Sequence, residues 1–415
     1  MNLKLHRSKI KSNAQIVITG SKSETNRLLL LQALYPEIQL KNTSNSDDSE
    51  VMMKTLTQVL EPTTHNPQPT TIDVHHAGTS MRFLTAYFAV QPDREIVLTG
   101  SSRMKERPIK ILVEALKQLG AEITYEENDG FPPIKIKGKK LTKNKVSLLA
   151  NISSQYISAL LLIAPKLENG LELTLEGKIT SISYIKMTLA LLGELGVTTT
   201  FVENKITVNS QLTIHNSQFT IESDWSSASY FYSVIALSEL GTQIMLSYYK
   251  KNSLQGDSDL AEIYKNFGVE TVFENNTILL RKTHHSPLTI HNLELNNCPD
   301  IAQTIALTCL GLGVNCKLTG LQTLKIKETD RLQALKNELE KFGASVEITS
   351  ESLSIQSTVF LKENVTIKTY QDHRMAMAFA PLALKTTLII EDAEVVSKSY
   401  PDFWKDMKTC GIEME

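Results

Sequence analysis

A joint of helix, glycine and strand recurs along this chain and constrains the fold more than any other feature of the sequence. Each copy has a helical stretch with an apolar face, then a glycine, then a few residues that alternate apolar and polar side chains. The glycines are Gly120, Gly196, Gly268, Gly343 and Gly411, at spacings of 76, 72, 75 and 68 residues. Glycine readily adopts the left-handed conformation that ends a helix, and a period of two is typical of a strand.

The period of this joint sets the size of a repeating unit. Solenoid repeats span about 20–50 residues, so the observed period is too long for a solenoid and suits a unit of two helices and about four strands. Six such units would nearly fill the 415 residues. We therefore expect an α/β protein with two similar halves, with sheets outside or between and helices packed inward.

Composition restricts the class of function. The chain has 43 Lys and Arg against 45 Asp and Glu, and this near balance supplies no overall field to attract nucleic acid or an anionic membrane. The longest apolar runs, around 157–165 and 304–314, are shorter than the roughly 20 residues that span a bilayer. The first 20 residues lack the continuous apolar segment of a secretion signal. We expect a cytoplasmic protein whose charge chemistry is local.

Neither the cysteines nor the paired histidines have the spacing of metal ligands. The four cysteines, Cys298, Cys309, Cys316 and Cys410, include no C-x-x-C pair. The pairs at 75–76 and 284–285 do not form H-E-x-x-H, and we expect the second pair in a loop. We predict four reduced, mostly buried thiols and no zinc site.

The first segment that carries chemistry is IVITGSKSETNRLLLLQAL, residues 16–34. It predicts a strand, a turn of small residues and a helix start, where unsatisfied N–H groups and the helix dipole favour an anion. Lys22 lies in the turn and Arg27 lies one turn onward. The segment is not a P-loop, because Gln15 stands where that motif requires glycine. A serine-capped helix with solvated bases is the alternative.

Other predicted helix starts have similar residues. A small polar turn delivers Arg82, and three bases, Arg103, Lys105 and Arg107, precede Pro108, which is a favoured residue for the first helical position. Bases so close together repel one another unless an anion lies among them; a solvated basic turn is the alternative.

Hydroxyl groups mark two more helix starts. Ser153 or Ser154 can cap a helix, and Gln155 adds a neutral donor there for a phosphate or a sugar-like ligand. Capping alone would also explain this segment. Asp224 and Ser226 precede a buried-looking helix, where packing and capping are a sufficient explanation.

Three later segments bring ionisable groups for proton transfer. They are Asp300 just after a proline, the run Lys327, Glu328, Asp330 and Arg331 in a capping-box-like start, and Asp372, His373 and Arg374 before an apolar helix. Paired surface charges are the alternative interpretation of an isolated segment. A base, a hydroxyl group or a carboxylate, however, recurs at one predicted helix start after another. We therefore expect several helix starts to converge on a cleft that binds more than one anionic group, with carboxylates for proton work.

In order and approximate spacing, these segments resemble the 5-enolpyruvylshikimate-3-phosphate synthase family. The motifs are TGSKSETNR, HAGTSMRF, RMKERPI, ISSQYISALL, ESDWSSASYF, QGD at Gln255, PDIAQTIA, KETDRL and QDHRMAMAF. The resemblance extends from about Ile16 to Pro401. KETDRL and DHRMAM are specific to that family rather than typical of α/β proteins in general.

The resemblance implies a two-lobed inside-out α/β barrel, in which each lobe has three pseudo-symmetric βαβαββ units. Residues 20–221 would form the first lobe, on the shikimate-phosphate side, and residues 1–19 with 222–415 the second. The lobes would close like a clamp on an active site in the cleft between them. The family transfers the enolpyruvyl group of phosphoenolpyruvate to the 5-hydroxyl of shikimate 3-phosphate, in the shikimate pathway to chorismate and aromatic amino acids. It needs no metal and no cofactor, and we expect a monomer with no nucleic-acid or membrane partner.

The resemblance also implies roles for individual residues. The catalytic group would be Lys22, Asp300 and Glu328, with Asp300 as base and Glu328 as acid. Shikimate 3-phosphate would contact Lys22, Ser23, Arg27, Ser153, Ser154, Gln155, Ser181, Tyr184, Asp300 and Lys327. Phosphoenolpyruvate would contact Lys22, Gly78, Arg107, Gln155, Arg331, His373, Arg374 and Lys398. Resemblance does not decide which carboxylate has which role.

Three positions depart from the family's usual pattern. His76 replaces an asparagine, Phe83 replaces a proline, and Thr323 replaces an asparagine that often binds shikimate phosphate. These departures bear on substrate affinity and on the response to glyphosate, which occupies the phosphoenolpyruvate site in this family. Gly78, typical of glyphosate-sensitive members, is retained.

Two other functions fit parts of the sequence. One is the sibling enzyme that transfers enolpyruvyl to UDP-N-acetylglucosamine, which commonly carries a reactive cysteine or aspartate in a mobile loop. The other is a non-catalytic repeat protein that binds phosphorylated metabolites. The loss of Lys22, Asp300 or Glu328 would mark such a protein, but the chain has all three.

Overall fold

The structure is a computed structural model that describes residues 1–60, 69–151, 153–212, 214, 217–286, 291–358 and 360–415. The chain divides into two compact units. The central unit is Ser21–Ile221, and the terminal unit combines Met1–Gly20 with Glu222–Glu415. None of the helices in the described part of the chain is both long and apolar enough to cross a membrane.

The central unit has two four-stranded sheets and one parallel pair of strands. The strand order in the first sheet is β4 (Thr70–Asp73), β5 (Glu95–Thr99), β7 (Ile134–Lys137), β6 (Glu122–Tyr125). The order in the second sheet is β8 (Lys145–Leu149), β9 (Leu171–Glu176), β11 (Lys205–Leu212), β10 (Val197–Val202). The parallel pair is β3 (Gln39–Lys41) with β12 (Gln218–Thr220). Its helices are α1 (Lys22–Leu34), α2 (Asp47–Leu60), α3 (Gly78–Ala89), α4 (Ser102–Lys105), α5 (Lys110–Gln118), α6 (Ser154–Ile163) and α7 (Ile182–Leu195).

The terminal unit has two four-stranded sheets and one three-stranded sheet. The strand order in the first sheet is β2 (Ala14–Val17), β13 (Gln243–Ser247), β15 (Thr277–Lys282), β14 (Val269–Glu274). The order in the second sheet is β16 (His291–Glu294), β17 (Cys316–Thr319), β19 (Ser352–Gln356), β18 (Ser345–Ile348). The order in the three-stranded sheet is β1 (Leu3–Leu5), β21 (Leu388–Ile390), β20 (Val365–Ile367). Its helices are α8 (Trp225–Leu237), α9 (Leu260–Ile263), α10 (Ala302–Leu312), α11 (Arg331–Lys341), α12 (His373–Phe379) and α13 (Phe403–Thr409).

All four four-stranded sheets have the same topology, which is the structural form of the sequence repeat. In each sheet the first two strands in chain order are parallel, and the last two form an antiparallel hairpin added beside the second. The parallel pairs need crossover helices, such as α3 between β4 and β5. In the described part of the chain the remaining two sheets have only two and three strands, so four copies of the repeat are complete.

The five glycines of the repeat have the conformation that the sequence predicts. Their φ angles are +103° at Gly120, +109° at Gly196, +77° at Gly268, +102° at Gly343 and +106° at Gly411. The first four each follow a helical segment and precede a strand by one or two residues, as Gly196 does between α7 and β10. The prediction of the helix–glycine–strand joint is therefore confirmed.

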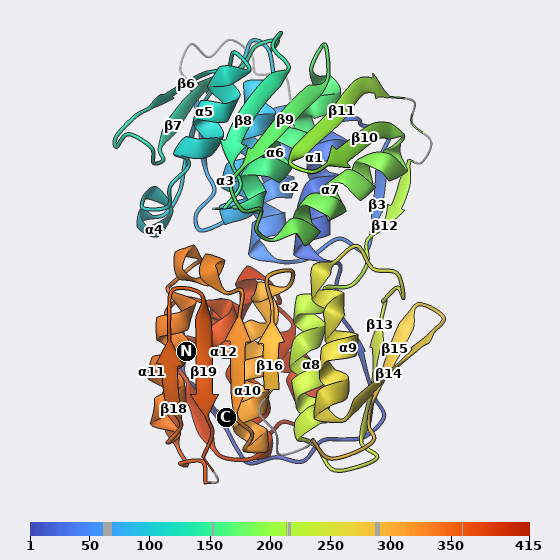
Figure 1. Cartoon of the computed structure of the whole chain (residues 1–415), viewed down its shortest axis with the longest axis vertical. Coiled ribbons are helices and arrows are strands. Elements are labelled where there is room, and N and C mark those ends of the chain that lie inside the picture. The colour runs from blue at the N-terminus through green and yellow to red at the C-terminus, as the bar shows by residue number, and fades with distance from the viewer. Residues whose placement is uncertain (61–68, 152, 213, 215–216, 287–290, 359) are drawn as a thin grey trace. The chain divides into compact units, whose positions relative to one another are not determined.

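Buried helices form the interior of each unit, and sheets form its exterior (Figure 1). Every residue of α3 is buried, as is every residue of α8 except Ser226. By contrast, β9 alternates buried and accessible residues, as expected for a strand with one solvated face. Because α3 and α8 are buried along almost their whole length, their starts lie at the ends of a packed core, and the packing holds the residues of their first turns in place. The four cysteines are buried and free, as predicted.

Candidate active site

In the central unit, Lys22 is the first residue of α1 and has an incomplete ion pair. Its Nζ lies 4.0 Å from Oδ2 of Asp48, and its side chain is 20% exposed. Asp48 also accepts from the hydroxyl of Ser80 at 2.8 Å. The carboxylate thus attracts the ammonium without taking a close hydrogen bond from it, so Lys22 can still donate to a ligand. Sequence reasoning missed Asp48, although acidic residues at a helix start were a usable signal.

Arg27 is buried and forms hydrogen bonds to neutral groups. Its guanidinium donates to the hydroxyls of Thr188 at 2.8 Å and Ser158 at 2.9 Å, and to the carbonyl of Ser23 at 2.7 Å. The rings of Phe83 and Tyr184 lie 5.5 and 5.7 Å from its Cζ. Burial lowers the pKa of Arg27 to about 10. Phe83, one of the departures from the family pattern, is therefore a cation–π partner of Arg27.

Arg107 and Gly78 are in direct contact. A Cβ added to Gly78 would lie 2.6 Å from Nη1 of Arg107, so only glycine leaves room for the guanidinium. The Nε of Arg107 is buried and has no hydrogen-bond partner among the residues that the structure describes. Arg82 donates to the carbonyls of Gly78 and Pro108, and its pKa falls to about 10 because of burial and then because of Arg107. Within the described residues neither guanidinium has a hydrogen bond to a carboxylate, and two such neighbouring groups favour an anion.

The predicted cluster of three bases before Pro108 is not a cluster of free charges. Arg103 forms an ion pair with Glu106 at 2.9 Å, and Lys105 forms one with Glu127 at 2.6 Å. The prediction that Pro108 takes the first helical position is wrong, because α5 begins at Lys110. The carbonyl of Pro108 instead accepts from the hydroxyl of Tyr156 at 2.6 Å and from Arg82, which holds this segment outside the helix.

Hydroxyl and amide groups complete the central set. Ser153 caps α6 as predicted, accepting from the backbone N–H of Gln155 at 3.3 Å. The amide of Gln155 donates to the hydroxyl of Thr79 at 3.3 Å, which ties the start of α6 to that of α3. Ser154 is buried in α6, and Ser181 precedes α7 with a left-handed φ of +51°. Such backbone strain in a residue other than glycine is often found at functional sites.

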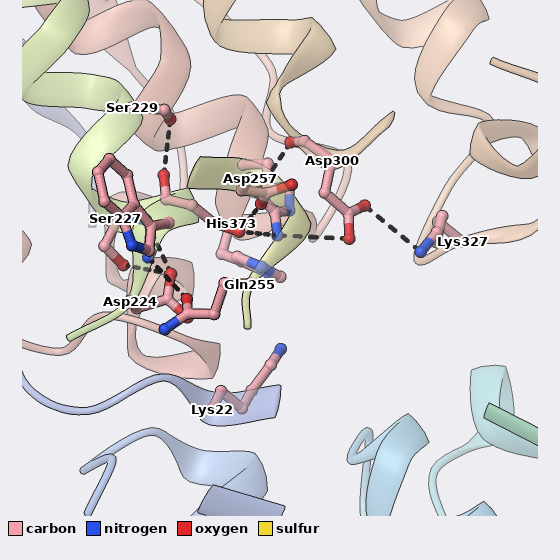
Figure 2. Close-up of polar contacts among 12 residues, drawn as sticks. Lys22, Asp224, Ser227, Ser229, Gln255, Asp257, Asp300, Lys327 and His373 are labelled. Atoms are coloured by element: carbon pink, nitrogen blue, oxygen red, sulfur yellow. Dashed lines mark hydrogen bonds and ion pairs between the residues drawn. The ribbon is translucent and has the colours of Figure 1, made fainter. Parts of the chain in front are cut away.

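In the terminal unit, Asp300 lies among three cations. Its carboxylate is 2.9 Å from Nη1 of Arg331, 3.3 Å from Nζ of Lys327 and 3.7 Å from Nη2 of Arg374. Figure 2 shows the Lys327 ammonium beside the Asp300 carboxylate. Three positive groups therefore lie within 4 Å of this carboxylate.

Arg331 joins three carboxylates that come from separate elements. Its guanidinium contacts Asp372 at 2.6 Å and Glu328 at 2.8 Å, in addition to Asp300, and its side chain is only 2% exposed. Burial alone would lower the pKa of Arg331, but Asp372, Glu328 and Asp300 outweigh burial and raise it. Arg331 therefore stays charged and holds the proposed base and the proposed acid on one rigid group.

The start of α12 is tied to the same cluster. Asp372 caps this helix, accepting from the backbone N–H of Arg374 at 2.9 Å. His373 is buried, with Nδ1 3.8 Å from Oδ1 of Asp372, and Lys398 donates to the carbonyl of Gln371 at 2.7 Å. Asp330 caps α11, accepting from two backbone N–H groups. The three later sequence segments thus form one network within the terminal unit.

Two departures from the family pattern have structural consequences. The Nε2 of His76 lies 3.5 Å from Oδ2 of Asp47, so this ring forms an ion pair when it is protonated. Thr323 is buried, and its hydroxyl has no hydrogen-bond partner within the described residues.

These two sets of residues place bases, hydroxyl groups and carboxylates at helix starts, as expected of an enzyme that acts on anionic substrates. The family model for EPSP synthase (3-phosphoshikimate 1-carboxyvinyltransferase) matches residues 7–407. The chain therefore belongs to the EPSP synthase family.

Similar proteins agree with this assignment. A 3-phosphoshikimate 1-carboxyvinyltransferase of Bacteroides fragilis (strain YCH46) is 43% identical over 405 residues, covering 96% of this chain and 95% of that protein. The protein of that name from Haemophilus influenzae (strain KW20 / Rd) is 36% identical over 423 residues, covering 95% and 96%. An EPSP synthase structure from Acinetobacter baumannii has a TM-score of 0.78 at 20% identity, covering 100% of this chain and 99% of that one, and shares the fold.

The comparisons also decide between the functions that the sequence left open. The chain is a transferase of the shikimate pathway, which leads to aromatic amino acids, and its activity is that of 3-phosphoshikimate 1-carboxyvinyltransferase. Neither the UDP-N-acetylglucosamine enzyme nor a non-catalytic repeat protein is favoured.

Proposed function

We propose that the chain carries out enolpyruvyl transfer by addition and elimination, with Asp300 and Glu328 as its proton-transfer groups. The observation that carries this proposal is the Asp300 carboxylate among three cations, with Glu328 attached to the same Arg331 guanidinium. In this proposal the Asp300 carboxylate accepts a proton, and the more accessible carboxyl group of Glu328 delivers one. Side-chain exposure is 9% for Asp300 and 25% for Glu328.

In the addition step, Asp300 takes the proton of the 5-hydroxyl group of shikimate 3-phosphate. The oxygen then forms a bond to C2 of phosphoenolpyruvate, while Glu328 gives a proton to C3 and the C2–C3 double bond becomes single. In the elimination step, the Glu328 carboxylate takes a proton back from C3, the C2–C3 double bond forms again and the C2–O bond to phosphate breaks. The phosphate leaves with the proton that Asp300 took in the addition step. Positive groups stabilise the leaving phosphate, as oriented charges stabilise other developing anions.

Substrate binding is assigned to the two sets of residues. We propose that shikimate 3-phosphate contacts Lys22, Ser23, Arg27, Ser153, Ser154, Gln155, Ser181, Tyr184, Asp300 and Lys327. We propose that phosphoenolpyruvate contacts Lys22, Gly78, Arg107, Gln155, Arg331, His373, Arg374 and Lys398. The paired guanidiniums of Arg82 and Arg107 support an anion site in the central unit. The burial of Arg27 and Arg331 supports anchoring roles, in which each holds the groups around it in place.

The proposal requires residues from both units to act on the same substrates. We propose that the units close on the substrates, with the active site shared by the two. Small-angle scattering tests this closure, because saturating shikimate 3-phosphate should reduce the radius of gyration. An unchanged radius would contradict it. We also propose a monomeric enzyme in the cytoplasm, which size-exclusion chromatography with light scattering and cell fractionation can test.

Phosphate release by the purified protein tests the activity directly. We expect release when both substrates are present and background release when either one is omitted. Release with phosphoenolpyruvate alone would indicate hydrolysis rather than transfer, and no release with both substrates would refute the proposed function.

A further inference from the structure

The first turn of α8 is anchored by a turn that lies about 30 residues further along the chain. The side-chain carbonyl of Gln255 accepts from the backbone N–H of Trp225 at 2.9 Å, and its amide donates to the carbonyl of Ser223 at 3.0 Å. Asp224 caps the same helix, accepting from the backbone N–H of Ser227 at 2.8 Å. Figure 2 shows Asp224, Ser227 and Gln255 around this helix start. The backbone around Ser226 is therefore held at several points.

Ser226 links this anchored turn to Arg374. Its hydroxyl donates to Oδ2 of Asp257, and its oxygen accepts from Nη2 of Arg374 at 3.1 Å. The other terminal nitrogen of Arg374, Nη1, donates to the carbonyl of Asp300 at 2.8 Å. A serine hydroxyl has only one hydrogen. Because that hydrogen points to Asp257, the oxygen presents lone pairs to Arg374.

Asp257 lies in a costly place for a carboxylate. Asp257 is only 5% exposed. Burial, and then the nearby Asp300, raises the pKa of the Asp257 carboxyl group to about 7. Asp257 lies in a short turn of 3-10 helix at Gly256–Asp259, within the QGD motif, and is not among the residues proposed to contact the substrates. The Asp257 carboxylate accepts from Ser226, which in turn accepts from Arg374, so this path links Asp257 to Arg374.

We propose that Asp257 is a positioning residue for phosphoenolpyruvate binding, because it holds the Ser226 hydroxyl in the orientation that accepts from Arg374. This inference rests on the proposed function, in which Arg374 contacts phosphoenolpyruvate. Without Asp257, the Ser226 hydroxyl is free to turn its hydrogen elsewhere, and Nη2 of Arg374 loses a fixed acceptor. The guanidinium then keeps its charge but loses part of its orientation.

Four variants test the path: Ser226→Ala, Asp257→Ala, Asp257→Asn and the double variant Ser226→Ala/Asp257→Ala. Asparagine keeps an oxygen that accepts from Ser226 and removes the charge. For Ser226→Ala and Asp257→Ala, we expect KM for phosphoenolpyruvate to rise about tenfold or more, the scale for losing a hydrogen bond to a charged group. KM for shikimate 3-phosphate should change much less. Asp257→Asn should restore most of the loss.

The double variant distinguishes positioning from a general loss of structure. If Asp257 acts through Ser226, the double variant should have the same KM for phosphoenolpyruvate as Ser226→Ala alone, because coupled residues are not additive. Multiplied effects would overturn the proposal. So would equal increases in both KM values, or a loss in Asp257→Asn as large as in Asp257→Ala. Asp259→Asn, an exposed position in the same turn, is the matched control and should behave as wild type.

Calorimetric titration of each protein with phosphoenolpyruvate gives a second measurement that does not need turnover. Wild-type protein that binds phosphoenolpyruvate but releases no phosphate would refute the proposed function, while the ranking of the variants in binding would still test the positioning role. Weaker binding in Asp257→Ala and Ser226→Ala supports the role. Unchanged binding in both variants, or no binding by the wild type, overturns it. If Asp257→Ala does not fold, Asp257→Asn is compared with Ser226→Ala instead. Near-normal binding by Asp257→Asn together with weakened binding by Ser226→Ala supports the role. Any other pattern overturns it.

Discussion

In the terminal unit Arg331 lies among Asp300, Glu328 and Asp372, whereas in the central unit Arg27 and Arg82 donate to hydroxyl and carbonyl groups. The carboxylates raise the pKa of the first arginine despite its burial, and burial lowers the pKa of the other two to about 10. Both arrangements orient a guanidinium. They differ in their partners: carboxylates contact the guanidinium in the terminal unit, and neutral groups accept its hydrogen bonds in the central unit.

The difference suggests a division of work. A balanced cluster of acids and bases can keep carboxyl groups at defined positions for proton transfer, because each charge is compensated before substrate arrives. Bases whose hydrogen-bond partners are neutral can still pair with a negative charge, and the phosphate or carboxylate group of a substrate can supply that charge. We therefore expect substitutions in the terminal cluster to affect stability and turnover, and substitutions around Arg107 to affect the affinity for phosphoenolpyruvate.

The largest expected effect is on stability. Arg331→Met leaves three carboxylates without their common partner, and we expect the free energy of unfolding to fall by about 3–5 kcal/mol. Arg27→Met removes bonds to neutral groups, which should cost less, about 1–3 kcal/mol. Urea unfolding followed by circular dichroism measures both. Equal losses would show that the balanced and unbalanced arrangements do not differ energetically.

The next effect is on turnover. Asp300→Ala and Glu328→Ala should each lower kcat at least about 100-fold, the scale for removing one positioned acid or base. Lys22→Ala should lower it similarly, since this ammonium is proposed to contact both substrates. Phosphate release at saturating substrates measures the change, with Glu340→Gln on the solvent side of α11 as the control. Near-normal release by folded Glu328→Ala would refute its role as the acid.

A smaller effect is expected from one added methyl group. Gly78→Ala places a Cβ within 3 Å of both terminal nitrogens of Arg107, so the flexible guanidinium must move. We expect KM for phosphoenolpyruvate to rise about tenfold, because a displacement near 1 Å is costly in an active site. Melting temperature should stay the same. Gly193→Ala, in α7 with nothing within 4 Å of the added Cβ, is the matched control and should leave KM unchanged.

The smallest effect is expected at His76. This ring forms a half-exposed ion pair with Asp47 when it is protonated, and such pairs contribute about 0–1 kcal/mol. His76→Asn restores the family's usual residue, and we expect less than about a threefold change in KM for phosphoenolpyruvate. Assays at pH 6 and pH 8 measure it. A tenfold change at either pH would place His76 among the specificity-determining residues.

Local sequence was enough to predict the start of most helices at the site. Serine at 153 and aspartate at 330 and 372 cap their helices through side-chain bonds that span two or three residues. The prediction for Pro108 was wrong because a distant residue, Tyr156, takes its carbonyl. Lys105 was predicted to be an uncompensated base, but its partner Glu127 lies 22 residues away in the sequence. Local pattern therefore predicted where polar groups gather, but not which groups would pair.

The sequence by itself determined the repeat, since helix ends and strand alternation depend on neighbouring residues and on the freedom of glycine to take a left-handed conformation. Only the tertiary structure decided that Arg331 would join three carboxylates, that Phe83 would cover Arg27, and that Asp257 would reach Arg374 through Ser226. Those contacts join residues up to 148 positions apart. Their geometry depends on how the helices pack, which no short stretch of sequence contains.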